Sequence, residues 1–263
     1  MKKIQTIIRK EWSEVFKNRL VLFTVAFLPL ILTAIPLGII YATTTSADFA
    51  SGAGDLPEQF NAMCPPEIAG GECFQVFMVS QFMIMFMIIP LAIPASISSY
   101  SIVGEKINRS LEPLLATPIT TAELLVGKSL AAIIPALIAT WAGFTIFIVG
   151  AWIMLSGSGI ISSFLDGRWL VAIFVIGPLM ALSAVAFSVI ISSRVNDPRV
   201  AEQVSMIIIL PVLAVFFGQL GGIIVLNIGF MIASAFVLAI VDGLLVYLAV
   251  RLFQRESILT RWK

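Results

Sequence analysis

The residues best able to do chemistry lie in segment 104–128, which reads GEKINRSLEPLLATPITTAELLVGK and holds six charged residues. Its last residues, Gly127-Lys128, followed by Ser129, match the end of a phosphate-binding loop, in which a glycine-rich turn after a strand cradles phosphate groups. That motif requires a glycine at position 122, where this chain has Ala122. We therefore predict that the chain does not hydrolyse ATP itself.

Enzyme and metal chemistry have little support elsewhere in the chain. Histidine, the commonest general base and metal ligand, is absent. The two cysteines, Cys64 and Cys73, are too few for a thiolate zinc site. We predict no catalytic residue and no metal site, which argues against a membrane hydrolase or metalloenzyme. Both cysteines lie in segment 43–73, where they form a disulfide or remain two free thiols. An oxidising compartment favours the disulfide.

The chain around these residues is that of a membrane protein. Hydrophobic residues make up 59% of the 263 positions and charged residues 12%. About 20 apolar residues cross the hydrocarbon core as a helix. The last apolar run has a turn signal at Gly221-Gly222 and is long enough for two helices; a half-inserted hairpin over 212–228 is the alternative. We predict an all-α polytopic protein, one transmembrane domain over 1–263, with spans at 20–42, 74–103, 121–155, 169–193, 203–220 and 228–250.

Basic residues predict the orientation, because Lys and Arg concentrate on the cytoplasmic side. Fifteen of the sixteen lie in segments 1–19, 104–128, 194–202 and 251–263. Segment 43–73 holds none of them and five acidic residues. We therefore expect both termini and segment 104–128 in the cytoplasm, with a cytoplasmic tail at 251–263 and an outer loop at 43–73.

The first eighteen residues predict an amphipathic helix in the cytoplasmic membrane interface. Its apolar residues recur with helical spacing, and basic residues lie nearby. We expect Trp12 at the level of the lipid headgroups. A simple topogenic leader is the alternative. The predicted apolar face consists of Ile4, Ile7, Ile8, Trp12, Val15 and Phe16.

Segment 104–128 divides into two parts. Thr120 and Glu123 have the spacing of a capping box, so we expect the third span to begin near Thr121. In the first part, 108–118, the leucines at 111, 114 and 115 predict a short amphipathic helix ended by Pro118. A solvated loop has no need of three leucines there.

The string G-E-K-x-x-x-S-L-E-P-L-L-A-T-P-I-x-x-x-E-L-L-x-G-K at 104–128 resembles the cytoplasmic loop of ABC-2-type permeases, the membrane subunits of type V ABC exporters. The large outer loop is similar to that of the sodium/drug-export branch. The resemblance implies two permease subunits, the same or similar, that form the pathway. Separate ATP-binding subunits would hold ATP and Mg and dock on loop 104–120, and the leader 1–18 would be the connecting helix. The implied ATPase-coupling residues are Glu105, Arg109, Leu111, Glu112, Leu114, Leu115, Thr120 and Glu123.

The same resemblance implies a pathway between the second and fifth spans. For any one candidate residue, lipid contact or core packing is the alternative. Glu105 likewise either transmits movement to the second span or pairs with Lys106 or Arg109 as a solvated charge. The candidate lining residues are Phe77, Gln81, Met85 and Phe86 in the second span, and Phe216, Phe217 and Gln219 in the fifth.

Asp242 is the acidic residue that lies deep in a predicted span. A charge there is costly unless it has a partner or a function. Either a neighbouring helix partners it, or it is the ion or proton site of a secondary transporter or channel. We expect the first, and an ATP-driven exporter in a prokaryotic cell membrane. The absence of obvious internal repeats disfavours secondary transport.

Overall fold

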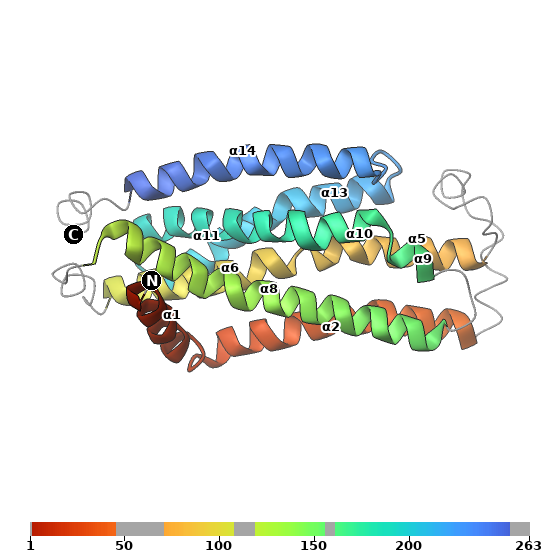
Figure 1. Ribbon diagram of the computed structural model, residues 1–263, viewed down its shortest axis with the longest axis horizontal. Helices are drawn as coiled ribbons and strands as arrows, with labels where there is room; N and C mark the ends of the chain where they lie inside the picture. The colour runs from red at the N-terminus through yellow and green to blue at the C-terminus, as the bar shows by residue number, and fades with distance from the viewer. Residues whose placement is uncertain (1, 46–70, 108–118, 156–160, 253–263) are drawn as a thin grey trace.

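The computed structural model describes residues 2–45, 71–107, 119–155 and 161–252, and these contain helices and no strand (Figure 1). Six helical segments are long and apolar enough to cross a membrane, which confirms the predicted all-α polytopic class. They are Val21–Thr45, Gln75–Ile107, Thr121–Met154, Gly167–Arg194, Pro198–Leu220 and Ile228–Leu252.

Three spans are single helices and three are divided. The undivided ones are α2 (Arg19–Thr45), α8 (Thr121–Met154) and α14 (Ile228–Leu252), and the N-terminal helix is α1 (Lys2–Val15). The second span consists of α5 (Gly71–Phe86) and α6 (Ile89–Ile107). The fourth consists of α10 (Gly167–Val171), the π-helical turn η2 (Ala172–Ile176) and α11 (Gly177–Arg194), preceded by α9 (Ile161–Phe164). The fifth consists of α12 (Pro198–Ser205), the 3₁₀ turn η3 (Met206–Ile209) and α13 (Leu210–Leu220).

Each division comes shortly before a proline. The break between α5 and α6 precedes Pro90, η2 precedes Pro178, and η3 precedes Pro211. A proline has no N–H group and its ring clashes with the preceding turn, so the backbone there changes its hydrogen-bond pattern. Pro198 is the first residue of α12, and the remaining prolines of the spans lie inside continuous helices: Pro29, Pro36, Pro94 and Pro135.

The second span forms the centre of the bundle. Of its most apolar window 72% is buried, against 11% for the sixth span. Helix α6 packs against α11, α8, α12 and α2, while α14 packs mainly on α11. The α11 face that meets these neighbours carries small residues, which let helices approach closely. Those residues, Gly177, Ala181, Ala184 and Ser188, are all buried.

The two ends of the bundle differ in what they carry. Helix α1, the end of α6, the start of α8 and the end of α14 lie together at one end, on the left in Figure 1. At the other end α13 and α14 are joined by a turn at 221–227, where Gly222 adopts a φ of 70° that favours glycine. Helices α13 and α14 therefore flank this turn, and the depth at which it lies in a membrane stays a prediction.

Candidate functional site

A buried cluster of charged side chains joins α1, α6 and α8 at the end of the bundle where segment 108–118 connects α6 to α8. Lys128 Nζ lies 2.9 Å from Glu11 Oε1 and 2.8 Å from Glu105 Oε2. Lys10 Nζ lies 2.5 Å from Glu105 Oε1. Glu11, Glu105 and Lys128 are 2%, 5% and 5% exposed. We call Lys10, Glu11, Ser101, Glu105 and Lys128 the charge cluster.

A serine hydroxyl completes the charge cluster. Ser101 Oγ donates to Glu11 Oε2 at 2.5 Å and accepts from Lys128 Nζ at 2.7 Å. Burying a charge is costly unless it is paired and hydrogen-bonded. Here two cations face two anions, and the hydroxyl bridges one pair. The paired charges therefore offset much of the cost of removing these groups from water.

Neighbouring side chains keep two groups of α1, Lys10 and Glu11, in their ionised forms. Burial acts to raise the pKa of Glu11, but Lys128, Ser101 and Lys10 outweigh it and hold that pKa below its usual value. Burial also opposes the charged form of Lys10, but the carboxylates of Glu105, Glu11 and Glu14 raise the pKa of Lys10. Both groups therefore stay charged at neutral pH, and α1 is electrostatically tied to α6 and α8.

Helix α1 also packs directly on the bundle. Ile7 and Val15, on either side of Glu11, are buried. Trp12 Nε1 donates to the backbone carbonyl of Ala131 in α8 at 2.9 Å. The predicted amphipathic helix therefore exists, and part of its apolar face contacts protein. The position of Trp12 among lipid headgroups stays a prediction.

The predicted start of the third span is confirmed. Helix α8 begins at Thr121, and Thr120 Oγ1 accepts from the backbone N–H of Glu123 at 3.1 Å. The Glu123 carboxylate accepts in turn from the backbone N–H of Thr120 at 2.9 Å, which completes the capping box. Lys3 Nζ of α1 lies 3.7 Å from this carboxylate. The same end of α8 is thus capped locally and contacted by α1.

Thr120→Ala is expected to lower the free energy of unfolding by about 1 kcal/mol, because it removes the side-chain acceptor at the start of α8. The measurement is the thermal midpoint in mild detergent. Thr121→Ala changes the next residue without removing the cap acceptor and serves as the control. Equal midpoints for the two variants would contradict the prediction.

The other predicted coupling residues have different outcomes. Glu105 is buried between Lys10 and Lys128, so it is not a solvated charge. Lys106 contacts the backbone carbonyls of Ser193 and Val195. Five predicted residues lie outside the described part of the chain: Arg109, Leu111, Glu112, Leu114 and Leu115.

The sequence Gly127-Lys128-Ser129 lies inside helix α8. A phosphate-binding loop needs its backbone N–H groups free to face phosphate, whereas a helix interior uses them in its own hydrogen bonds. The Lys128 ammonium is also occupied by Glu11 and Glu105. The resemblance of these three residues to a phosphate site is therefore coincidental.

Sequence reasoning did not identify four members of the charge cluster: Lys10, Glu11, Ser101 and Lys128. A signal was present, since Glu11 lies four residues from Ile7 and from Val15 on the apolar face of α1. A charge in the middle of an apolar face calls for a buried partner. Its partner Lys128 is 117 residues away, and the sequence does not indicate that pairing.

The candidate pathway residues do not all face one space. Phe77 and Gln219 line a cavity of about 490 Å³ near the opposite end of the bundle. Phe86 packs against Gly143 of α8, while Phe217 is 64% exposed. Of the rest, Gln81 is buried, and Met85 and Phe216 are half-buried.

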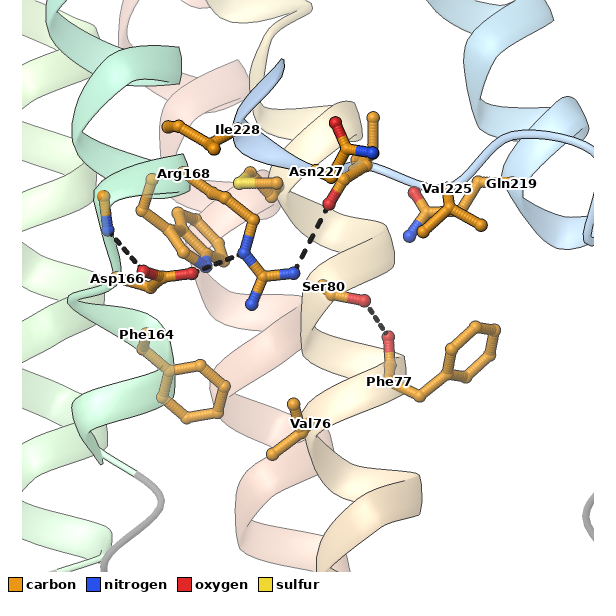
Figure 2. Close-up of a pocket in the computed structure, with 14 residues that line it drawn as sticks. Val76, Phe77, Ser80, Phe164, Asp166, Arg168, Gln219, Val225, Asn227 and Ile228 are labelled. Carbon is orange, nitrogen blue, oxygen red and sulfur yellow. Dashed lines mark hydrogen bonds and ion pairs between the residues drawn. The ribbon is translucent and has the colours of Figure 1, made fainter. Parts of the chain in front are cut away.

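This polar cavity, shown in Figure 2, is bordered by α5, α9, α10, Gln219 near the end of α13 and the turn before α14. Arg168 Nε lies 2.5 Å from Asp166 Oδ2, and another guanidinium nitrogen donates to the Leu226 carbonyl at 3.4 Å. Gln219 lies across the cavity from this ion pair (Figure 2). The cavity therefore offers hydrogen-bond donors and acceptors to a polar group. Its own ion pair adds no net charge.

Asp242 is buried in α14, with 3% of its surface exposed. Ser183 of α11 donates a hydrogen bond to its Oδ1, and Oδ2 has no hydrogen-bond partner within the described residues. The predicted partner on a neighbouring helix therefore exists, as a hydroxyl rather than a cation. The predicted disulfide lies outside the described residues at Cys64, and nothing is described of the Cys73 side chain.

The family model described as "ABC-2 family transporter protein" matches residues 5–256. This range includes the charge cluster, the polar cavity and all six spans. The chain belongs to the ABC-2 transporter family. The match confirms the resemblance noted for segment 104–128. A search of curated proteins finds no match to this ABC-2 protein.

Family membership makes this ABC-2 protein a multi-pass membrane component of an ABC transporter. Such membrane components generally do not carry the catalytic site, and association with an ABC ATP-binding subunit follows from the family. The charge cluster of this ABC-2 protein flanks segment 108–118, with Glu105 before it and Lys128 after it.

Proposed function

We propose that this protein is the permease subunit of an ATP-driven exporter in a prokaryotic cell membrane. Two permease subunits, identical or similar, form the pathway. Separate subunits bind ATP and Mg and act on the pathway through loop 104–120. The observation that carries this proposal is the charge cluster, which joins α1 to the helices on both sides of that loop.

The charge cluster supports a specific route for coupling. Glu105 lies near the end of α6, and Lys128 lies about two turns into α8. Both pair with α1, so a displacement of segment 108–118 reaches α1, α6 and α8 together. Energetic coupling of this kind requires a connected element that two sites can bias. ATP binding in the partner would move the segment, and α6 would carry the movement into the centre of the bundle.

Leu114→Asp tests the docking step. The substitution places a carboxylate on the predicted apolar face of 108–118, and we expect it to abolish both copurification of the ATPase and ATP-driven transport. The measurement is affinity purification in mild detergent, followed by transport in vesicles. Ala116→Asp adds the same charge on the opposite side of the predicted helix and should retain both properties. If Leu114→Asp and Leu115→Asp each retain both copurification of the ATPase and ATP-driven transport, docking at this segment is refuted.

Asp242 supports a second candidate, secondary transport, because its Oδ2 is buried without a partner in the described residues. We nevertheless expect Asp242→Asn to fold and to transport normally, since an amide oxygen can still accept from Ser183. Purified yield and ATP-dependent transport measure this. Normal folding with the loss of transport of one cation would favour secondary transport instead.

A further inference from the structure

A second cavity lies next to the polar cavity. It has a volume of about 380 Å³ and is lined almost entirely by apolar side chains from the second span, η2, α11, α13 and α14. Met83 and Leu226 line both cavities and form the boundary between them. We call this second space the apolar cavity.

The two cavities are stacked along the bundle. On the second span the lining continues from Val76 in the polar cavity to Met87, just after α5, in the apolar cavity. On the fourth span the lining continues from Trp169 in the polar cavity to Met180 in the apolar cavity. On α14 it continues from Ile228 in the polar cavity to Leu238 in the apolar cavity. The shift along α14 alone corresponds to about 15 Å. The two spaces are therefore adjacent and follow one another along the bundle.

The apolar cavity is accessible from the side of the bundle. Helix α13 packs on α5 whereas α14 packs mainly on α11, and the cavity lies between these two pairs. Val237, which lines the cavity, is 58% exposed. In a membrane, an acyl chain can enter from the surrounding lipid without crossing the polar cavity.

The polar cavity indicates what kind of head group fits. Asp166 and Arg168 form an ion pair, so the pair contributes no net charge. The Gln219 amide oxygen is buried and has no hydrogen-bond partner within the described residues. Asn227 uses its amide oxygen to cap α14, which leaves its NH₂ group as a donor. A buried acceptor without a partner calls for a ligand donor.

We propose that the two cavities form one binding site for a zwitterionic amphipathic molecule. Its head, with a cation that carries N–H donors, lies in the polar cavity, and one acyl chain lies in the apolar cavity. Gln219 accepts from the cation, and Arg168 and Asn227 donate to the anionic part. The proposal that this molecule belongs to the exported cargo class rests on the proposed function. The proposal that it binds in these cavities does not.

Photocrosslinking of the purified full chain in lipid nanodiscs tests this site. The probes are lysophosphatidylethanolamine and lysophosphatidylcholine, each with a diazirine at the end of the acyl chain. We expect adducts on cavity residues such as Met231 and Val215. Half-maximal labelling should need about fivefold less of the ethanolamine probe, because choline has no N–H donor for Gln219. Equal labelling by both probes would overturn the assignment of the head group.

Two substitutions test the two cavities separately. Val215→Trp fills the apolar cavity and should weaken labelling about tenfold, the loss from displacing about two methylenes. Ala214→Trp adds the same side chain at a neighbouring exposed residue that lines neither cavity, and should label normally. Gln219→Leu should remove the preference for ethanolamine. Equal labelling of the two tryptophan variants, or adducts spread over lipid-facing residues such as Ile232, would show ordinary bilayer contact and overturn the proposal.

This inference and the proposed function can fail independently. If site-specific labelling is absent while Leu114→Asp still releases the ATPase, the amphipath site is refuted and the permease role stands. If labelling occurs as expected while Leu114→Asp retains the ATPase and transport, the binding site stands and docking of the ATPase at segment 108–118 is refuted.

Discussion

Lys128→Met is expected to lower the free energy of unfolding by about 3–5 kcal/mol, the usual cost of breaking a buried ion pair on one side. The ammonium contacts Glu11, Glu105 and Ser101, and methionine replaces none of these interactions. Two buried carboxylates would then share the single remaining cation of the charge cluster, Lys10. Helix α1 should therefore separate from the bundle, or the protein should fail to accumulate.

The measurement is the thermal midpoint and monodisperse yield in mild detergent. Lys3→Met is the matched control, because Lys3 is half-exposed and its ion pair with Glu123 is 3.7 Å long. We expect that control to change stability by less than about 1 kcal/mol. Lys128→Met combined with Glu105→Gln removes one charge of each sign and should recover part of the loss. A similar midpoint for the two single variants would show that the charge cluster contributes little.

The number of spans, the start of α8 and the family could all be predicted from the sequence, because each depends on local signals. Uncharged runs of membrane length predict spans, and the four residues Thr120–Glu123 contain the whole capping box. The exclusion of a phosphate-binding loop was equally local, since Ala122 occupies a required glycine position. In each case the residues that decide the outcome are close together in the chain.

The charge cluster and the paired cavities could not be predicted in this way, because they depend on contacts between distant segments. Glu11, Glu105 and Lys128 come from three helices, and although Glu11 on the apolar face of α1 calls for a buried partner, no local signal identifies that partner. The cavities arise because α13 and α14, adjacent in sequence, pack mainly on different partners. Hydrophobic periodicity indicates that such faces are buried or in lipid, but does not indicate which helix covers them.

The division of spans into shorter helices could be predicted from the sequence only in part. A proline inside a membrane helix can interrupt it, and Pro90, Pro178 and Pro211 do follow interruptions. Pro135, inside the continuous helix α8, does not. A membrane helix tolerates a proline where neighbouring groups satisfy the freed carbonyl. Whether a given proline divides a helix is therefore decided by packing, which the sequence does not show.

Gly127→Leu is expected to release α1 from α8, because α1 rests directly on this glycine. A Cβ at Gly127 would lie 2.9 Å from Ile7 Cγ2 and 3.0 Å from Ile7 Cβ. A side-chain rotation cannot move the Ile7 Cβ atom, so α1 itself must shift. Overpacking of this kind costs typically about 1–3 kcal/mol. The shift would also separate Glu11 from Lys128, the residue next to the substitution.

Trypsin reports the release of α1, since cleavage after Arg9 requires that helix to leave the bundle. We expect Gly127→Leu to be cut about tenfold faster than the parent, because proteolysis follows the population of the open form. Gly104→Leu is the control, since a Cβ at Gly104 meets nothing within 4 Å. If the proposed coupling route holds, Gly127→Leu retains the ATPase, which docks on 108–118, but loses ATP-driven transport. Equal cleavage of the two variants would show that α1 does not rest on this glycine, and transport undiminished by faster cleavage would remove α1 from the coupling route.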